Sequence, residues 1–136
     1  MSTGTERLVW ERGLLFQGQD SRGFGLAISG DPEIEGAKPS DLLPLALASC
    51  LAYDVVVVLK KKRQELRSLV VVLESVQEDV PPLRFLRISL SFEVSGVIEK
   101  AAADRALVLA EKNCPVLASL APSVEVVTSI AVVPDS

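Results

Sequence analysis

The alternation of apolar and turn-forming residues predicts short strands at the beginning of the chain. Three apolar segments lie at residues 8–10, 14–16 and 24–29. Gly13, Gly18 and the turn sequence of residues 20–23 separate these segments, as expected between paired strands. A loop rich in glycine, proline and acidic residues follows at residues 30–37.

The most apolar stretch, residues 42–59, predicts one long helix. Ser40 is the expected N-cap, and Asp41 lies in the first turn, where a negative charge favours the helix dipole. We expect the helix to continue to about residue 63 and, because it is apolar almost all round, to be covered on most sides. Its 18 residues also reach the minimum for a membrane span, but Asp54 within it argues for the core helix of a soluble protein.

The second half of the chain alternates between strand and helix patterns. Strands are predicted at residues 66–77, 83–94 and 124–133, and helices at residues 99–113 and 116–120. Gly96 is expected to end the second of these strands, and Pro115 to separate the two helices. The order βββ-α-ββ-αα-β predicts a single α+β domain, residues 1–136, with mostly antiparallel pairing.

Composition and charge narrow the possible partners. Apolar residues make up 49% of the 136 positions but aromatic residues only 4%, so aliphatic surface exceeds what a small monomer easily hides, and we expect an oligomer. A net charge of −4 with no basic stripe argues against nucleic-acid binding. Two cysteines without an export signal or a disulfide framework favour the cytoplasm.

The candidate chemistry lies in the two cysteines, Cys50 and Cys114. The chain has no histidine, which excludes an imidazole base and most catalytic zinc sites. Cys114 precedes Pro115, and as the cap of a short helix its sulfur would face free backbone N–H groups that stabilise a thiolate. Cys50 lies too far from the N-terminus of its helix for the helix dipole to stabilise a thiolate there. The negative charge of Asp54 on the same face also disfavours the Cys50 thiolate.

Two interpretations of these residues stay open at this point. The cysteines are either a redox-active pair or two buried residues that act as small hydrophobes. Asp54 is either part of a site or a hydrogen-bonded carboxylate at a contact between helices. If Cys50 is reactive, groups from another segment or another subunit must activate it.

Motifs around both cysteines resemble a known superfamily. The motifs are Pro39-Ser40-Asp41-Leu42 leading to Cys50, Asp54-Val55-Val56 with the basic end Lys60-Lys61-Lys62-Arg63, and Asn113-Cys114-Pro115. In this order and spacing they resemble the OsmC/Ohr superfamily, the osmotically inducible and organic-hydroperoxide-resistance proteins. The YhfA-like branch of that superfamily is the closer match, and the resemblance covers essentially the whole chain.

This resemblance implies an OsmC-like fold, with two mostly antiparallel sheets around long central helices in an intertwined homodimer whose active sites lie at the interface. In the peroxide-reducing branches the equivalent of Cys50 attacks the peroxide and becomes a sulfenic acid. The equivalent of Cys114 then forms a disulfide with it, and a dithiol reductant such as a lipoylated protein restores both thiols. Neither metal nor flavin is required.

The chain departs from the peroxidase branches beside the thiol. Those branches place a glutamate after an Asn-Pro pair and use an arginine. Here the nearest acid is Asp41, while Arg22, followed by Arg12, is the best candidate for the arginine.

The leading hypothesis is a cytoplasmic thiol-dependent peroxidase that reduces organic hydroperoxides in an oxidative stress response, with no nucleic-acid or membrane partner. The alternatives are a non-catalytic module that binds an apolar, acyl-type ligand and a redox-sensing dimer.

Overall fold

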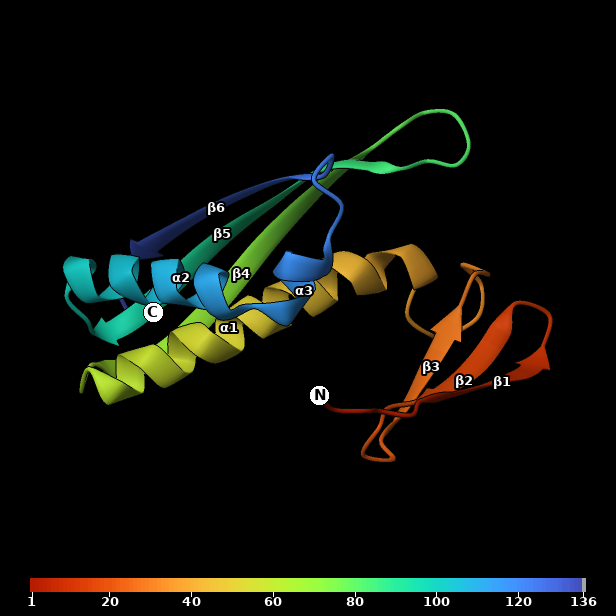
Figure 1. Ribbon diagram of the computed structural model, residues 1–136, viewed down its shortest axis with the longest axis horizontal. Helices are drawn as coiled ribbons and strands as arrows, with labels where there is room; N and C mark the ends of the chain where they lie inside the picture. Colours follow the sequence, from red (N-terminus) through yellow and green to blue (C-terminus); the bar gives the residue numbers. More distant parts are fainter. Residues whose placement is uncertain (136) are drawn as a thin grey trace. The chain divides into compact units, whose positions relative to one another are not determined.

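The computed structural model describes residues 1–135 and divides into two compact units, Met1–Leu43 and Pro44–Ser136. Each unit contains one three-stranded sheet, and the helices follow the first sheet in the chain (Figure 1). The predicted α+β architecture with two small, mostly antiparallel sheets is confirmed. The intertwined homodimer and the single domain over residues 1–136 stay predictions.

The first unit is an antiparallel sheet with one apolar face. Its strands are β1 (Arg7–Arg12), β2 (Leu15–Gln19) and β3 (Gly25–Ser29), close to the predicted segments. The register aligns Leu8, Gly18 and Leu26 in one row and Trp10, Phe16 and Ile28 in the next. Because alternate residues of a strand point to the same face, these two rows form one apolar surface. Leu8 is 62% exposed and Trp10 64%, so the first unit itself leaves much of that surface uncovered.

The long helix begins in a tighter turn than the sequence predicted. The 3₁₀ turn η1 (Pro39–Asp41) leads directly into α1 (Leu42–Lys61), and Lys38 holds the N-cap position without a side-chain hydrogen bond. The prediction of Ser40 as the N-cap was therefore wrong. Pro39 explains the earlier start, because its fixed φ and missing N–H suit the first position of a helix.

The second unit packs helices against a mixed sheet. Strand β5 (Phe85–Val97) lies between β4 (Glu65–Gln77), which is antiparallel to it, and β6 (Glu125–Val132), which is parallel. Helices α1 and α2 (Lys100–Asn113) run beside this sheet, and the short α3 (Pro115–Ser119) follows α2 (Figure 1). Gly96 does not end β5 as predicted, since it pairs with Leu66 inside the sheet.

The core of the second unit lies between the sheet and the helices. Strand β5 supplies Ile88, Leu90, Phe92 and Val94, α1 supplies Leu47, Leu51, Val55 and Leu59, and α2 supplies Ala103, Ala106, Leu107 and Ala110. Each large aliphatic or aromatic side chain buried this way contributes about 1.5–3 kcal/mol of transfer free energy. The alanines let α2 approach the sheet closely.

Helix α1 is buried on one side only, which corrects the expectation that most of its sides are covered. By length and composition the helix could cross a membrane, yet its buried residues belong to the core of a folded unit. Only 33% of its apolar window is buried within the chain. Tyr53 (70% exposed), Leu45 (50%) and Val56 (42%) form an apolar stripe that the second unit itself leaves exposed.

Arg63 holds a backbone conformation that normally belongs to glycine. It directly follows the last turn of α1, with a φ of 57°, while the Gln64 N–H donates to the carbonyl of Leu59. This is the helix-ending geometry in which glycine avoids the steric cost of a Cβ atom. The cost for an L-residue in that region is about 1–2 kcal/mol.

Replacing Arg63 by glycine is expected to stabilise the fold. The relief of the Cβ clash exceeds the backbone entropy that glycine loses on folding, which leaves a net gain of about 0.5–1 kcal/mol. Urea unfolding would measure it as a higher midpoint with an unchanged slope. A lower midpoint would mean that contacts of the arginine side chain outweigh its backbone strain.

Candidate active site at the two cysteines

The fold brings the two cysteines together in the second unit. Cys50 lies in α1, is partly buried and packs against the core. Cys114 is the residue between α2 and α3 and is only 2% exposed. Both are free thiols, and their side chains lie close enough to interact. A partly buried cysteine therefore lies beside a buried one.

The local sequence around Cys114 explains how its sulfur is held. Pro115 is the first residue of α3, and the Leu117 N–H donates to Sγ of Cys114 at 3.3 Å. Cys114 therefore caps α3, as the sequence predicted. Val116 and Leu117 of the short helix also pack against the core, which fixes the orientation of the cap.

The cap does not make Cys114 a stabilised thiolate, contrary to the sequence-based expectation. Burial raises the pKa of the Cys114 thiol above its ordinary value, and the interaction with the neighbouring Cys50 raises it further. The N–H groups of Leu117 and Val116 oppose this shift but do not reverse it. Cys114 is thus a protonated thiol at neutral pH, able to donate its S–H to the sulfur of Cys50.

This raised pKa predicts a loss of stability in alkali. The unfolded chain releases the Cys114 proton first as pH rises above about 8.5, so this contribution is complete below that pH and disappears as pH rises through the folded pKa. Urea midpoints at pH 8 and pH 10, with the thiols kept reduced, are expected to fall more for the wild type than for Cys114→Ala. Equal falls for the two proteins would contradict the raised pKa.

Asp54 is the charged residue closest in helical position to Cys50. The two lie one turn apart on α1, and Asp54 is partly buried. Among residues 1–135 its carboxylate forms no ion pair and no side-chain hydrogen bond. The alternative of a hydrogen-bonded contact between helices is thus not realised within the described chain.

The other predicted site residues belong to the first unit. Arg22 is exposed in the turn before β3, 3.7 Å from the carboxylate of Asp20. Arg12 ends β1, and Asp41 ends η1. These three residues lie in the first unit, whereas both thiols lie in the second. The supporting roles of Arg22, Arg12 and Asp41 therefore stay predictions.

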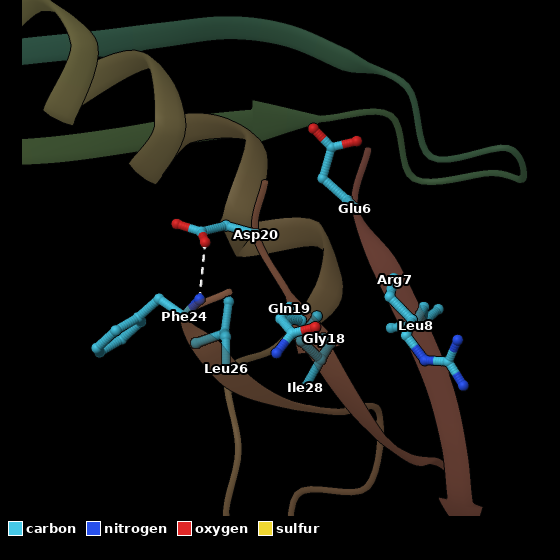
Figure 2. A pocket seen from close by; sticks show the side chains of 9 residues that line it. All are labelled: Glu6, Arg7, Leu8, Gly18, Gln19, Asp20, Phe24, Leu26 and Ile28. Carbon is cyan, nitrogen blue, oxygen red and sulfur yellow. Dashed lines mark hydrogen bonds between the residues drawn. The ribbon is translucent and has the colours of Figure 1, made fainter. Parts of the chain in front are cut away.

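A separate apolar pocket lies in the first unit (Figure 2). Its volume is about 510 Å³, and its apolar walls come from Leu8, Phe24, Leu26 and Ile28. Glu6, Arg7, Gln19 and Asp20 supply polar groups at its margin, and the Phe24 N–H donates to Asp20 at 2.8 Å. That hydrogen bond is the main cause of the lowered pKa of the Asp20 carboxyl. The pocket has the size of a small-molecule site.

No group of three or more histidine, cysteine or acidic residues within the described part of the chain is arranged to hold a metal ion.

A comparison with protein-family models assigns residues 30–129 to the OsmC-like proteins. This chain belongs to the OsmC family. Protein YhfA from Escherichia coli K12 is 34% identical to this OsmC-like chain over 129 residues, which cover 93% of this chain and 96% of YhfA. The matched region includes both cysteines, so the resemblance seen in the motifs is confirmed.

Solved structures share the fold of this OsmC-like protein. A hypothetical protein from Aquifex aeolicus is 26% identical and superposes with a TM-score of 0.89 over 100% of both chains. An organic hydroperoxide resistance protein from Elizabethkingia anophelis is 15% identical, with a TM-score of 0.70 over 96% of both chains. At that identity the second likeness concerns the fold alone.

Sequence reasoning reached one feature of the site only through the family resemblance and missed another. The first is the proximity of the thiols, because nothing in the spacing of Cys50 and Cys114 by itself brings the end of α2 to the middle of α1. The second is the pocket of the first unit. Its signal was available in the alternation of β1 and β3, where Leu8, Leu26 and Ile28 point to one face.

Proposed function

We propose that this OsmC-like protein is a thiol-dependent peroxidase that reduces organic hydroperoxides with Cys50 and Cys114. The observation that carries the proposal is the adjacent pair of thiols, one in a partly buried residue and one in a buried residue. A nucleophilic sulfur must be reachable, whereas a resolving sulfur needs only to be adjacent. Cys50 is therefore the attacking residue and Cys114 the resolving residue.

The reaction proceeds in three balanced steps. The Cys50 sulfur attacks the terminal peroxide oxygen, the O–O bond breaks, and a sulfenic acid and an alcohol form. The Cys114 sulfur then displaces the hydroxyl group of the sulfenic acid, which leaves as water with the Cys114 proton and gives a disulfide. An external dithiol, such as a lipoylated protein, transfers two electrons and two protons to regenerate both thiols.

The surroundings of the thiols support apolar hydroperoxides over hydrogen peroxide. Cys50 packs in a cluster of aliphatic and small side chains that includes Leu47, Leu51 and Leu117. An alkyl or aryl group buries its own surface against such a cluster, at about 25 cal/mol per Å² removed from water, and hydrogen peroxide gains nothing there. Asp54, one helical turn from Cys50, is proposed as a supporting residue, and Arg22 and Asp41 are supporting residues carried over from the family resemblance.

The test is a stoichiometric reaction of the reduced protein with cumene hydroperoxide and, separately, with hydrogen peroxide. Free thiols are counted against time and the product is mapped by peptide mass. Rapid loss of two thiols per chain with a Cys50–Cys114 link, faster for cumene hydroperoxide, is expected. Thiols that remain free after prolonged exposure would refute the peroxidase, and slow oxidation that only stabilises the fold would favour a redox sensor.

We further propose a cytoplasmic homodimer. Each unit by itself leaves one apolar surface exposed among the described residues. In the first unit this is the apolar face of the sheet, with Leu8 and Trp10, and in the second it is the α1 stripe of Leu45, Tyr53 and Val56. A second copy that covers both removes a large exposed apolar area from water. Sedimentation velocity at micromolar concentration is expected to give twice the mass of the chain, and a stable monomer would contradict the dimer.

A second candidate function, a module that binds an apolar ligand, is favoured by the 510 Å³ pocket of the first unit. Leu8, Phe24 and Leu26 would contact an acyl or aryl group there. Native mass spectrometry of the purified protein distinguishes the functions, because co-purified lipid together with unreactive thiols supports the module.

A further inference from the structure

The end of helix α1 carries a concentration of positive charge unlike the rest of the molecule. Lys60, Lys61, Lys62 and Arg63 are consecutive and exposed, in a chain of net charge −4. Within the described residues none of the four forms an ion pair. The helix dipole accounts for cations in the last turn, but it does not require an arginine beyond that turn.

Arg63 supplies the second observation. With its φ of 57° it stands in a conformation where glycine is expected to make the fold more stable. A side chain kept at a strained position points to a use for that side chain, since such strain concentrates at functional sites. The useful part of an exposed arginine is its guanidinium group, which binds carboxylates with two parallel hydrogen bonds.

The same helix connects this basic end to the reactive thiol. Cys50, Asp54, Val57 and Lys61 follow one another at spacings of four, three and four residues, so they share one face of α1. At 1.5 Å per residue, Lys61 lies about 16 Å along the helix from Cys50. Cys50, Asp54 and Val57 are each partly buried, and this face leads to the exposed Lys61.

We propose that the basic end of α1 docks an acidic protein that carries the reducing dithiol on a flexible arm. This inference rests on the proposed function, because it names the partner for the third step. When the partner is bound at Lys61 and Arg63, its flexible arm extends along the shared face of α1 and reaches the Cys50–Cys114 disulfide. One arm thiolate attacks a disulfide sulfur, the second arm thiol resolves the mixed disulfide, and two electrons and two protons pass to Cys50 and Cys114.

The experiment compares two dithiols on the oxidised protein. Diamide, a chemical thiol oxidant, prepares the Cys50–Cys114 disulfide independently of any peroxide. Its reduction is then followed with an isolated dihydrolipoyl domain of net negative charge and with free dihydrolipoamide. The measured quantity is the rate of reduction by the dihydrolipoyl domain divided by the rate with free dihydrolipoamide. A substitution that changes the general reactivity of the disulfide alters both rates, and this effect cancels in the ratio.

Charge reversal at the basic end is expected to lower that ratio. For Lys61→Glu we expect a fall of about tenfold at low ionic strength, and for the wild type a fall as salt is added. The matched control is Arg105→Glu, an exposed reversal on α2 that is expected to change the ratio by less than about twofold. Arg63→Gly is expected to lower the ratio severalfold while raising the unfolding midpoint, a combination that a purely structural role would not give.

Several results would overturn the docking site. Equal ratios for Lys61→Glu and Arg105→Glu, a ratio insensitive to salt, or the failure of diamide to form the disulfide would each do so. The peroxidase proposal fails separately, if hydroperoxide leaves the thiols free while the disulfide made with diamide is still reduced selectively by the acidic domain.

Discussion

Replacing Cys50 by serine is expected to slow the reduction of cumene hydroperoxide by about a thousandfold or more. A serine hydroxyl stays protonated at neutral pH and is a far weaker nucleophile than a thiolate, and no histidine is present to activate it. The measurement is peroxide consumption with a dithiol in excess. A Cys50→Ser protein that retains most of the rate would assign the chemistry elsewhere in the chain.

The matched variants at Cys114 separate its two proposed tasks. Cys114→Ser and Cys114→Ala both remove the resolving sulfur, so each is expected to complete one turnover and then accumulate sulfenic and sulfinic acid at Cys50. Only serine keeps a group that can donate a hydrogen bond to the Cys50 sulfur, the part proposed for the Cys114 S–H. Because a hydrogen bond to a charged group contributes about 1.5–3 kcal/mol, the first turnover of the alanine variant is expected to be at least about tenfold slower than that of the serine variant.

Most of the fold was predictable from local patterns. The alternation in residues 85–94 and the cap at Cys114 depend on neighbours along the chain, and both were predicted close to their observed positions. Ser40 shows the limit of this reasoning, because two signals competed and proline at the first helical position prevailed over the better capping side chain.

The site itself was only partly predictable. The identity of the cysteines and the absence of histidine follow from composition, but the protonation of Cys114 depends on burial, which is a tertiary property. The free amides of α3 suggested a thiolate, and the loss of solvation together with the nearby Cys50 outweighs them. The one-sided burial of α1 could not be predicted either. When a helix is apolar on all sides, its sequence pattern does not indicate which face packs against the rest of the chain.

Gly96 provides the second large expected effect, on stability rather than on activity. It has a φ of 131°, and a Cβ atom there would overlap the carbonyl oxygen of Glu65 and lie 3.0 Å from the Arg67 nitrogen. Both obstacles are backbone atoms of the paired strand β4, at its irregularity between Leu66 and Ser68. Neither can rotate away as a flexible side chain would. Gly96→Ala is therefore expected to lower the free energy of unfolding by about 3–5 kcal/mol in urea titrations.

Gly13→Ala is the matched control for Gly96→Ala. Gly13 also has a positive φ, 49°, but a Cβ atom there meets nothing within 4 Å. This substitution adds only the strain of the left-handed region, partly offset by the lower entropy of the unfolded chain, for a loss of about 1 kcal/mol. The difference between the stability losses of the two variants measures the cost of the close approach of β4 and β5. Equal losses of stability would mean that the strands separate at little cost and that β4 and β5 do not fix the end of the sheet.

Gly96→Ala is also expected to affect the thiols. Since β5 leads into α2 and Cys114, the substitution is expected to weaken the contact between the thiols and so to slow disulfide formation.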